Sequence, residues 1–181
     1  MRLKQIDPEQ ATGKVKTMFE ALQARIGIVP NLTRGLANSP AALEAYLAMK
    51  TALGGGMLDA RFGERISLAT AEANDCDYCL SAHTYYGRKL GLSEDETAAA
   101  RHGDSSDPRI AEGLRFAKLL TEKRGHIQPE DVERVRAAGY TDGEIAELVA
   151  HVAINVFTNY FNLVNVTPID FPHVKPLSKA A

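Results

Sequence analysis

Residues 64–83 read ERISLATAEANDCDYCLSAH, and this stretch contains both cysteines of the 181-residue chain. Apolar and small residues recur in it at helical spacing, and an Asn-Asp pair interrupts the pattern. We predict one helix over about 58–74 and a second over about 75–90, closed by Gly91. The two cysteines then lie at the start of the second helix, three residues apart.

The rest of the chain also contains sequence signals for helix starts. Capping side chains and prolines mark helix starts at Asp7-Pro8, Ser39-Pro40, Ser93, Asp107-Pro108, Pro129 and Thr141. No segment alternates apolar and polar residues with a period of two, so the pattern predicts an all-α fold. We expect a single domain over residues 1–181, with its core motif in 58–96 and an extended, proline-containing C-terminal arm over about 167–181.

Composition narrows the class of protein. Hydrophobic residues make up 45% and charged residues 24%, which is typical of a globular protein. The formal net charge of −2 gives no reason to expect a nucleic acid partner. No apolar run approaches the ~20 residues that span a bilayer, and the N-terminus lacks the apolar core of a signal peptide. We therefore expect a cytoplasmic protein with no membrane partner, where a lone Cys-x-x-Cys pair is more often catalytic or metal-binding than structural.

The cysteine segment favours a reactive thiol. Asp75 is placed to cap the helix, and the unpaired N–H groups and positive dipole at a helix start stabilise a thiolate. Such a position lowers a cysteine pKa of about 8.5 to roughly 3.5–7.5. Cys76, Cys79 and His83 share one helical stripe. His83, one turn from Cys79, is placed to take the thiol proton directly or through a water.

Glu64 belongs to the preceding helix, where Leu68 and Ala71 share its face. We expect its carboxylate to be partly buried, to need a partner and to have a raised pKa. A glutamate beside a histidine that is next to a thiol forms a proton relay. In that relay Glu64 orients His83, and His83 activates Cys79.

Other interpretations of these residues stay open. The cysteines could be small hydrophobes of the core, and Glu64 a solvated surface carboxylate. Zinc in a non-enzymatic interaction protein is a stronger rival, because Cys-x-x-Cys-x-x-x-His supplies three ligands and Glu64, His102 or His151 could be a fourth. The pair could also serve a general dithiol-disulfide oxidoreductase or a redox sensor. Tyr85 and Tyr86 are expected to pack, with a place in the site wall also open.

The last predicted helix, about 141–166, is apolar on several sides. Such a helix is buried in a core or covered by another subunit. Its apolar surface exceeds what a small domain can cover, so we expect a cyclic homo-oligomer, a homotrimer or a homohexamer. Within it we expect His151 to be a hydrogen-bonded core histidine. Asn155, Asn159 and Asn162 are expected to satisfy buried backbone or to line an interface.

The quoted stretch resembles the AhpD-like alkylhydroperoxidase family of the carboxymuconolactone decarboxylase-like superfamily. The family pattern is a glutamate, a gap of eleven residues, Cys-x-x-Cys, three residues and a histidine. Glu64, Cys76, Cys79 and His83 match that pattern. The likeness extends more loosely over 58–96, and the upstream segment IVPNL and the long last helix also look like peroxidase-related members.

The resemblance implies an all-helical fold that assembles as trimers or hexamers. It implies reduction of an organic hydroperoxide, in which Cys79 becomes a sulfenic acid and Cys76 resolves it as an intramolecular disulfide. Glu64 and His83 would form the relay, and a thiol or dithiol would be the reductant. No metal or organic cofactor is implied, since the cysteines are the redox centre. Decarboxylation is not expected, because that branch lacks the dithiol. Tyr78 stands where the best-known peroxidase member has a histidine, and a tyrosine does not relay protons at neutral pH as imidazole does.

Overall fold

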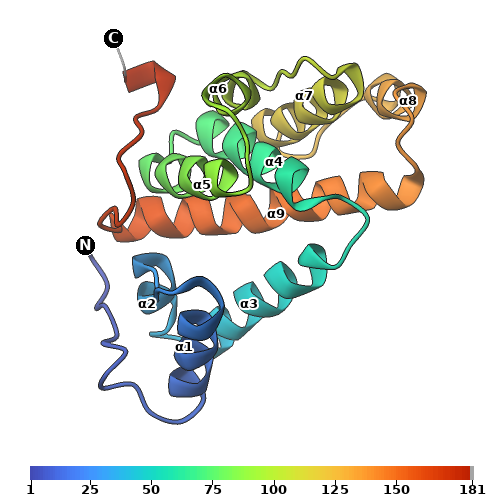
Figure 1. Ribbon diagram of the computed structural model, residues 1–181. Coiled ribbons are helices and arrows are strands. Elements are labelled where there is room, and N and C mark those ends of the chain that lie inside the picture. Colours follow the sequence, from blue (N-terminus) through green and yellow to red (C-terminus); the bar gives the residue numbers. More distant parts are fainter. Residues whose placement is uncertain (180–181) are drawn as a thin grey trace.

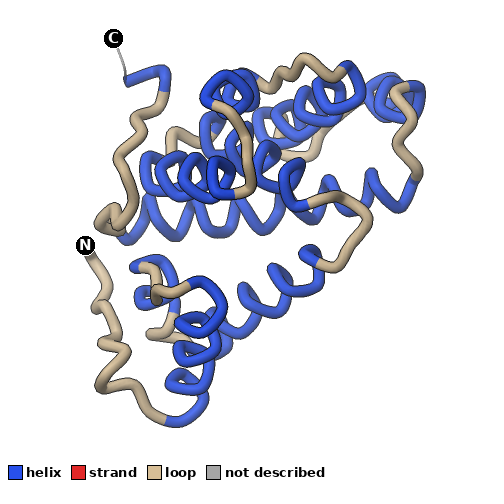
Figure 2. Tube along the Cα trace, in the orientation of Figure 1, coloured by secondary structure: helices blue, strands red, loops and turns tan. Residues whose placement is uncertain are grey.

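The computed structural model describes residues 1–179, and every regular element in that part of the chain is a helix (Figures 1 and 2). The all-α prediction is confirmed. The helices are α1 (Gly13–Ile26), α2 (Asn31–Leu36), α3 (Pro40–Gly54), α4 (Ala60–Ala73), α5 (Asp77–Lys89), α6 (Glu94–His102), α7 (Pro108–Glu122), α8 (Pro129–Ala137) and α9 (Asp142–Asn165), with a 3₁₀ turn, η1, at Leu177–Lys179. Within residues 1–179, no helix is both long enough and apolar enough to cross a membrane.

The central helix of the larger group is α4, which packs against α5, α6, α7 and α9 (Figure 1). Every side chain from position 62 to position 71 of α4 is buried. The long helix α9 runs along one side of that group (Figure 1). The helices α1, α2 and α3 form a second, smaller group, which meets the first mainly where α2 and α3 contact α9.

Most of the predicted helix starts are confirmed. Ser39, Ser93, Asp107 and Thr141 each accept a hydrogen bond from a backbone N–H in the first turn of the helix that follows. The capping boxes expected at Ser93 and Thr141 are both present, and Pro129 begins α8. These local signals therefore determine where α3, α6, α7, α8 and α9 begin.

The start of the first helix differs from the prediction. Residues after Pro8 form a single turn, closed by a hydrogen bond from the Gln10 N–H to the Asp7 carbonyl at 3.1 Å. Thr12 then has an extended backbone, so α1 begins only at Gly13. The short helix α2 has no counterpart among the predicted helices, because six residues are too few to display a helical period.

The turn between α4 and α5 also corrects one expectation. The N-cap of α5 is Cys76 and not Asp75, and the Cys76 Sγ accepts a hydrogen bond from the Cys79 N–H at 3.3 Å. Asp75 instead has a positive φ of 52°, a conformation that Asp tolerates better than most residues. The sharp reversal there allows α5 to fold back against α4.

The C-terminal segment contacts both α4 and α5. The Val174 N–H donates to the Ser81 Oγ at 2.9 Å, and the Leu177 N–H donates to a Glu72 carboxylate oxygen at 2.6 Å. Residues 167–176 have no helical structure, and their Phe171 ring packs against the Tyr78 ring with a centroid distance of 5.8 Å. The last two positions of the expected arm, 180 and 181, lie outside the described residues.

Candidate functional site

The two cysteines are joined by a disulfide at the start of α5. Their Cα atoms are 5.3 Å apart, inside the usual range of about 4.4–6.8 Å. Only 1% of Cys76 and 2% of Cys79 is exposed, so both sulfurs are shielded from bulk water. The spacing of the Cys-x-x-Cys pair at a helix start is therefore compatible with a bond between them.

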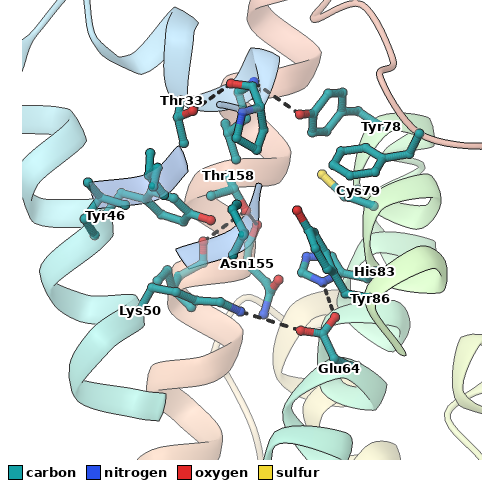
Figure 3. A pocket seen from close by; sticks show the side chains of 18 of the residues that line it. Thr33, Tyr46, Lys50, Glu64, Tyr78, Cys79, His83, Tyr86, Asn155 and Thr158 are labelled. Carbon is teal, nitrogen blue, oxygen red and sulfur yellow. Dashed lines mark hydrogen bonds and ion pairs between the residues drawn. The ribbon is translucent and has the colours of Figure 1, made fainter. Parts of the chain in front are cut away.

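Glu64 and His83 are hydrogen-bonded through the Oε2 and Nδ1 atoms at 2.7 Å (Figure 3). This contact was expected from the sequence, and the packing of α4 against α5 brings the two residues together. Both are largely buried, with 10% of the Glu64 and 16% of the His83 side chain exposed. When Nδ1 of a neutral imidazole donates to the carboxylate, Nε2 is the nitrogen that can accept a proton.

The expectation of a raised pKa for Glu64 is wrong. Burial acts to raise the pKa of this carboxyl, but the charge and hydrogen bond of His83 and the ammonium of Lys50 outweigh burial and lower it. The Lys50 Nζ, from α3, lies 3.8 Å from the Glu64 Oε1 (Figure 3). Glu64 is therefore ionised at neutral pH, as an acceptor for the His83 N–H should be.

Residues from both groups of helices line a cavity of about 640 Å³. The helix α5 contributes Cys79, His83 and Tyr86 to one wall (Figure 3). The opposite wall comes from α1 and α3, and α9 supplies a third side. These other sides include Leu22, Ile26, Tyr46, Leu47, Ile154, Asn155 and Thr158. A cavity of this size with a largely apolar lining and a few polar groups is typical of a small-molecule site.

Asn162, on α9, contacts the sulfur of Cys79. Its Nδ2 donates a hydrogen bond to the Cys79 Sγ at 3.4 Å, and its Oδ1 is buried without a hydrogen-bond partner. An amide donor aimed at a sulfur favours the thiolate over the thiol when the pair is reduced. This is the most direct polar contact that Cys79 receives from outside α5.

Tyr78, between the cysteines, links α5 to α2. It is buried, and its hydroxyl accepts a hydrogen bond from the Leu32 N–H at 3.2 Å. Burial and the neighbouring Asp170 raise the pKa of the Tyr78 phenol far above its usual value, so it keeps its proton. Tyr78 therefore has a packing and bridging position, with its polar tip turned to the neighbouring helix.

Other residues singled out from the sequence lie outside the relay. Burial lowers the pKa of His151, and its Nε2 is buried with no hydrogen-bond partner, so the hydrogen bond expected of a core histidine is missing at that nitrogen. The Asn155 Nδ2 donates to the backbone carbonyl of His151 at 2.8 Å, as expected of a residue that satisfies buried backbone. Asn159 instead accepts a hydrogen bond from the Asn74 side chain at 2.9 Å.

The groups considered as zinc ligands do not gather at the cysteines. His102 is exposed at the end of α6, and Glu64 is engaged by His83. Within residues 1–179, no group of three or more His, Cys, Asp and Glu side chains is arranged to hold a metal ion.

A model of the carboxymuconolactone decarboxylase family matches residues 40–119, which contain the whole α4–α5 pair. An uncharacterised peroxidase-related protein from Silicibacter sp. TM1040 has a similar structure, with a TM-score of 0.82 and 25% identity over 93% of this chain and 90% of that one. The AhpD-core, peroxidase-related protein from Ralstonia eutropha JMP134 also has a TM-score of 0.82, with 26% identity over 93% and 92% of the two chains. Residues 40–119 thus match the carboxymuconolactone decarboxylase family, and the chain has the fold of these AhpD-like, peroxidase-related structures.

The AhpD-like fold is also found in an enzyme named for a different activity. The debrominase Bmp8, solved in complex with 2,3,4-tribromopyrrole, has a TM-score of 0.81 at 17% identity, with 94% of this chain and 92% of that one covered. At this identity the likeness concerns the fold alone. No curated protein sequence matches the chain significantly.

Several residues of the cavity could not be predicted from the sequence. Lys50 and Tyr46 come from α3, which the sequence connects to the cysteines only through tertiary packing. Asn162 was assigned to backbone or interface contacts, although its spacing from Asn155 and Asn159 marks a polar stripe on an otherwise apolar helix. Such a stripe on a buried helix is a signal that it faces a polar group of the core.

Proposed function

We propose that this protein is a thiol-dependent peroxidase that reduces organic hydroperoxides. The observation that carries the proposal is that Cys79 and His83 face one largely apolar cavity while Glu64 holds His83 at 2.7 Å. The two similar structures at 25% and 26% identity are named peroxidase-related, which supports the same class of reaction.

The first step uses the reduced protein. The His83 Nε2 accepts the proton of the Cys79 thiol, and Glu64 stabilises the imidazolium that forms. The thiolate attacks the terminal oxygen of the hydroperoxide, so that a sulfur–oxygen bond forms as the oxygen–oxygen bond breaks. The departing alkoxide takes a proton from His83 and leaves as an alcohol. Cys79 is oxidised to a sulfenic acid, and the hydroperoxide is reduced.

The second step closes the cycle without a metal or an organic cofactor. The Cys76 thiol attacks the Cys79 sulfur, a disulfide forms, and the sulfenic hydroxyl leaves with the Cys76 proton as water. The Cys76–Cys79 disulfide of the structure has this connectivity. A thiol or dithiol reductant then returns both cysteines to thiols and is itself oxidised to a disulfide.

The cavity favours an organic substrate over hydrogen peroxide. Its volume of about 640 Å³ is in the range that encloses a small organic molecule. Apolar side chains from α1, α3 and α9 would cover the organic part of the hydroperoxide, while the peroxide end reaches Cys79. Burial of that organic part would contribute about 25 cal/mol per Å² of apolar surface.

We also propose that the protein assembles as a homotrimer or homohexamer in the cytoplasm, with no nucleic acid or membrane partner. Val149, Phe157, Tyr160 and Val164 lie on one face of α9, and each is at least 40% exposed. A continuous apolar face of this kind is typical of a surface between subunits. Sedimentation at micromolar concentration should give a trimer or hexamer, and a monomer would contradict the assembly.

The decisive experiment counts thiols. The reduced protein should lose both titratable thiols after one equivalent of cumene hydroperoxide, and mass spectrometry should find the Cys76–Cys79 disulfide. The Cys76→Ser variant should form a persistent sulfenic acid that dimedone traps, whereas Cys79→Ser should form none. Two thiols that survive the hydroperoxide but react readily with small disulfides would favour a general dithiol-disulfide oxidoreductase or a redox sensor. Stoichiometric zinc in the reduced protein would favour the interaction protein.

A further inference from the structure

Tyr86 lies on the same face of α5 as the reacting groups. Cys79, His83 and Tyr86 are spaced i, i+4 and i+7, so they form one stripe of the helix. All three line the cavity, and Figure 3 shows the Tyr86 ring beside His83 with its hydroxyl directed toward the space in front of Cys79. The phenol therefore faces the place where the peroxide group would react.

The Tyr86 hydroxyl lacks a hydrogen-bond partner of the kind that the Tyr78 and Tyr140 hydroxyls have. The Tyr78 hydroxyl accepts from the Leu32 N–H at 3.2 Å, and the Tyr140 hydroxyl donates to the Arg109 carbonyl at 2.9 Å. The Tyr86 oxygen is buried and has no hydrogen-bond partner among residues 1–179. Because leaving a buried hydroxyl without a hydrogen bond is destabilising, such a group in a cavity wall indicates a place for a bound partner.

The ring of Tyr86 is fixed and its proton is retained. Edge-to-face contacts hold the ring between Tyr85, at a centroid distance of 5.4 Å, and Phe171, at 5.5 Å. Burial raises the pKa of the Tyr86 phenol to about 12. At neutral pH the group is therefore a preoriented hydrogen-bond donor.

We propose that Tyr86 is a further catalytic residue, whose hydroxyl donates a hydrogen bond to the hydroperoxide oxygen that carries the organic group. This inference rests on the proposed peroxidase function. As the thiolate attacks the terminal oxygen, negative charge develops on the second oxygen while the oxygen–oxygen bond breaks. The Tyr86 hydrogen bond stabilises that charge, and His83 supplies the proton that completes the alcohol. Tyr86 keeps its own proton throughout.

The test compares Tyr86→Phe with Tyr85→Phe, both of which keep the aromatic packing. Tyr85 is the matched control because its hydroxyl lies outside the cavity wall. Stopped-flow oxidation of the reduced protein by cumene hydroperoxide should be about 10²–10³-fold slower in Tyr86→Phe, the usual loss for one donor to a developing oxyanion. The Tyr85→Phe variant should react at the wild-type rate.

The leaving group separates this role from a structural one. Peracetic acid releases a carboxylate, which needs little stabilisation, so its rate should fall at least about tenfold less than that of cumene hydroperoxide in Tyr86→Phe. Reaction of the reduced variant with a small aromatic disulfide should proceed at the wild-type rate, because no oxygen leaves. Equal losses with all three reagents would overturn the Tyr86 role and indicate a disturbed thiol.

The same data distinguish failure of the inference from failure of the proposed function. A wild-type protein that reacts with hydroperoxides, together with an equally fast Tyr86→Phe, would overturn the role of Tyr86 alone. A wild-type protein that reacts with the aromatic disulfide but with neither oxygen reagent would overturn the peroxidase proposal and this role together.

Discussion

The two facing walls of the cavity are built in different ways. The wall that carries the dithiol comes from α5 with α4 behind it, and residues 64–86 supply its reacting groups in one continuous stretch. The opposite wall comes from α1 and α3, which contribute apolar and polar side chains: Leu22, Ile26 and Leu47 with Arg25, Tyr46 and Lys50. The contrast suggests that a local sequence pattern determines the chemistry, while the packing of separate segments determines the shape of the substrate space.

The largest expected effect comes from breaking the relay in the α4–α5 wall. Glu64→Gln and His83→Ala should each slow hydroperoxide reduction by roughly 10²–10⁴-fold, the usual contribution of a positioned acid or base. The loss should be the same for bulky and small peroxides, because both use the same thiolate. Single-turnover rates measure it.

The double variant is the control for this relay. Because residues that act as a unit are non-additive, Glu64→Gln combined with His83→Ala should lose little more than either change alone. Fully additive losses, or a wild-type rate in Glu64→Gln, would show that Glu64 is a structural carboxylate with no part in the relay. The electrostatics of the helix start and Asn162 would then have to activate Cys79 without it.

A smaller and selective effect is expected in the opposite wall. Leu47→Trp should fill part of the cavity and lower the rate with cumene hydroperoxide by about tenfold, the order of discrimination a filled apolar pocket gives, while hydrogen peroxide is scarcely affected. Ala48→Trp is the matched control, since Ala48 is exposed on the same helix. If Leu47→Trp slowed both peroxides equally, the division of roles between the walls would be wrong.

The smallest effect concerns Lys50, the one charged group of the α3 wall that reaches the relay. Lys50 helps to lower the pKa of Glu64, so the active carboxylate is present above that pKa and is lost as pH falls through it. Lys50→Met should raise the pKa and move the acid limb of the pH–rate profile to higher pH. The shift should be below about one pH unit, because a partly exposed pair contributes roughly 0.2–1 kcal/mol.

The control for this shift is Lys14→Met, which removes an exposed ion pair with Glu44 on the same group of helices. Its acid limb should coincide with that of the wild type. If the Lys50→Met profile also coincided with that of the wild type, the pKa of Glu64 would be determined by groups of the α4–α5 wall and not by Lys50.

The sequence predicts the first wall better than the second for a physical reason. Glu64, Cys79 and His83 are near one another along the chain, so helical periodicity and a short turn nearly determine that all three line one cavity and that Glu64 meets His83. Asn162 and Lys50 reach the same site only through long-range packing, which periodicity does not encode. The pKa of Glu64 shows a related limit of the sequence analysis. Burial alone predicts a raised pKa, but His83 from the same stretch, and then Lys50 from α3, lower it.

The fold follows the same pattern. Caps such as Ser93 and Thr141 act within four residues, and the sequence locates them correctly. The helix α1 begins late because Thr12 has an extended backbone. No local sequence signal predicts that conformation. The N-cap of α5 is Cys76 and not the predicted Asp75, because the backbone reverses direction at Asp75.

The C-terminal segment has a kinetic consequence. It is fastened on both sides of the cysteine turn, since Val174 bonds Ser81, and Ser178 bonds Asp75 through its Oγ at 2.5 Å. Because Cys76 and Cys79 are at most 2% exposed, a protein reductant needs a local opening to reach their sulfurs, and we expect this C-terminal segment to be the part that detaches. The rate of reduction of the disulfide by a macromolecular dithiol should then level off at high dithiol concentration. The maximum rate would equal the rate at which the C-terminal segment opens spontaneously. A small monothiol should show a higher ceiling or none.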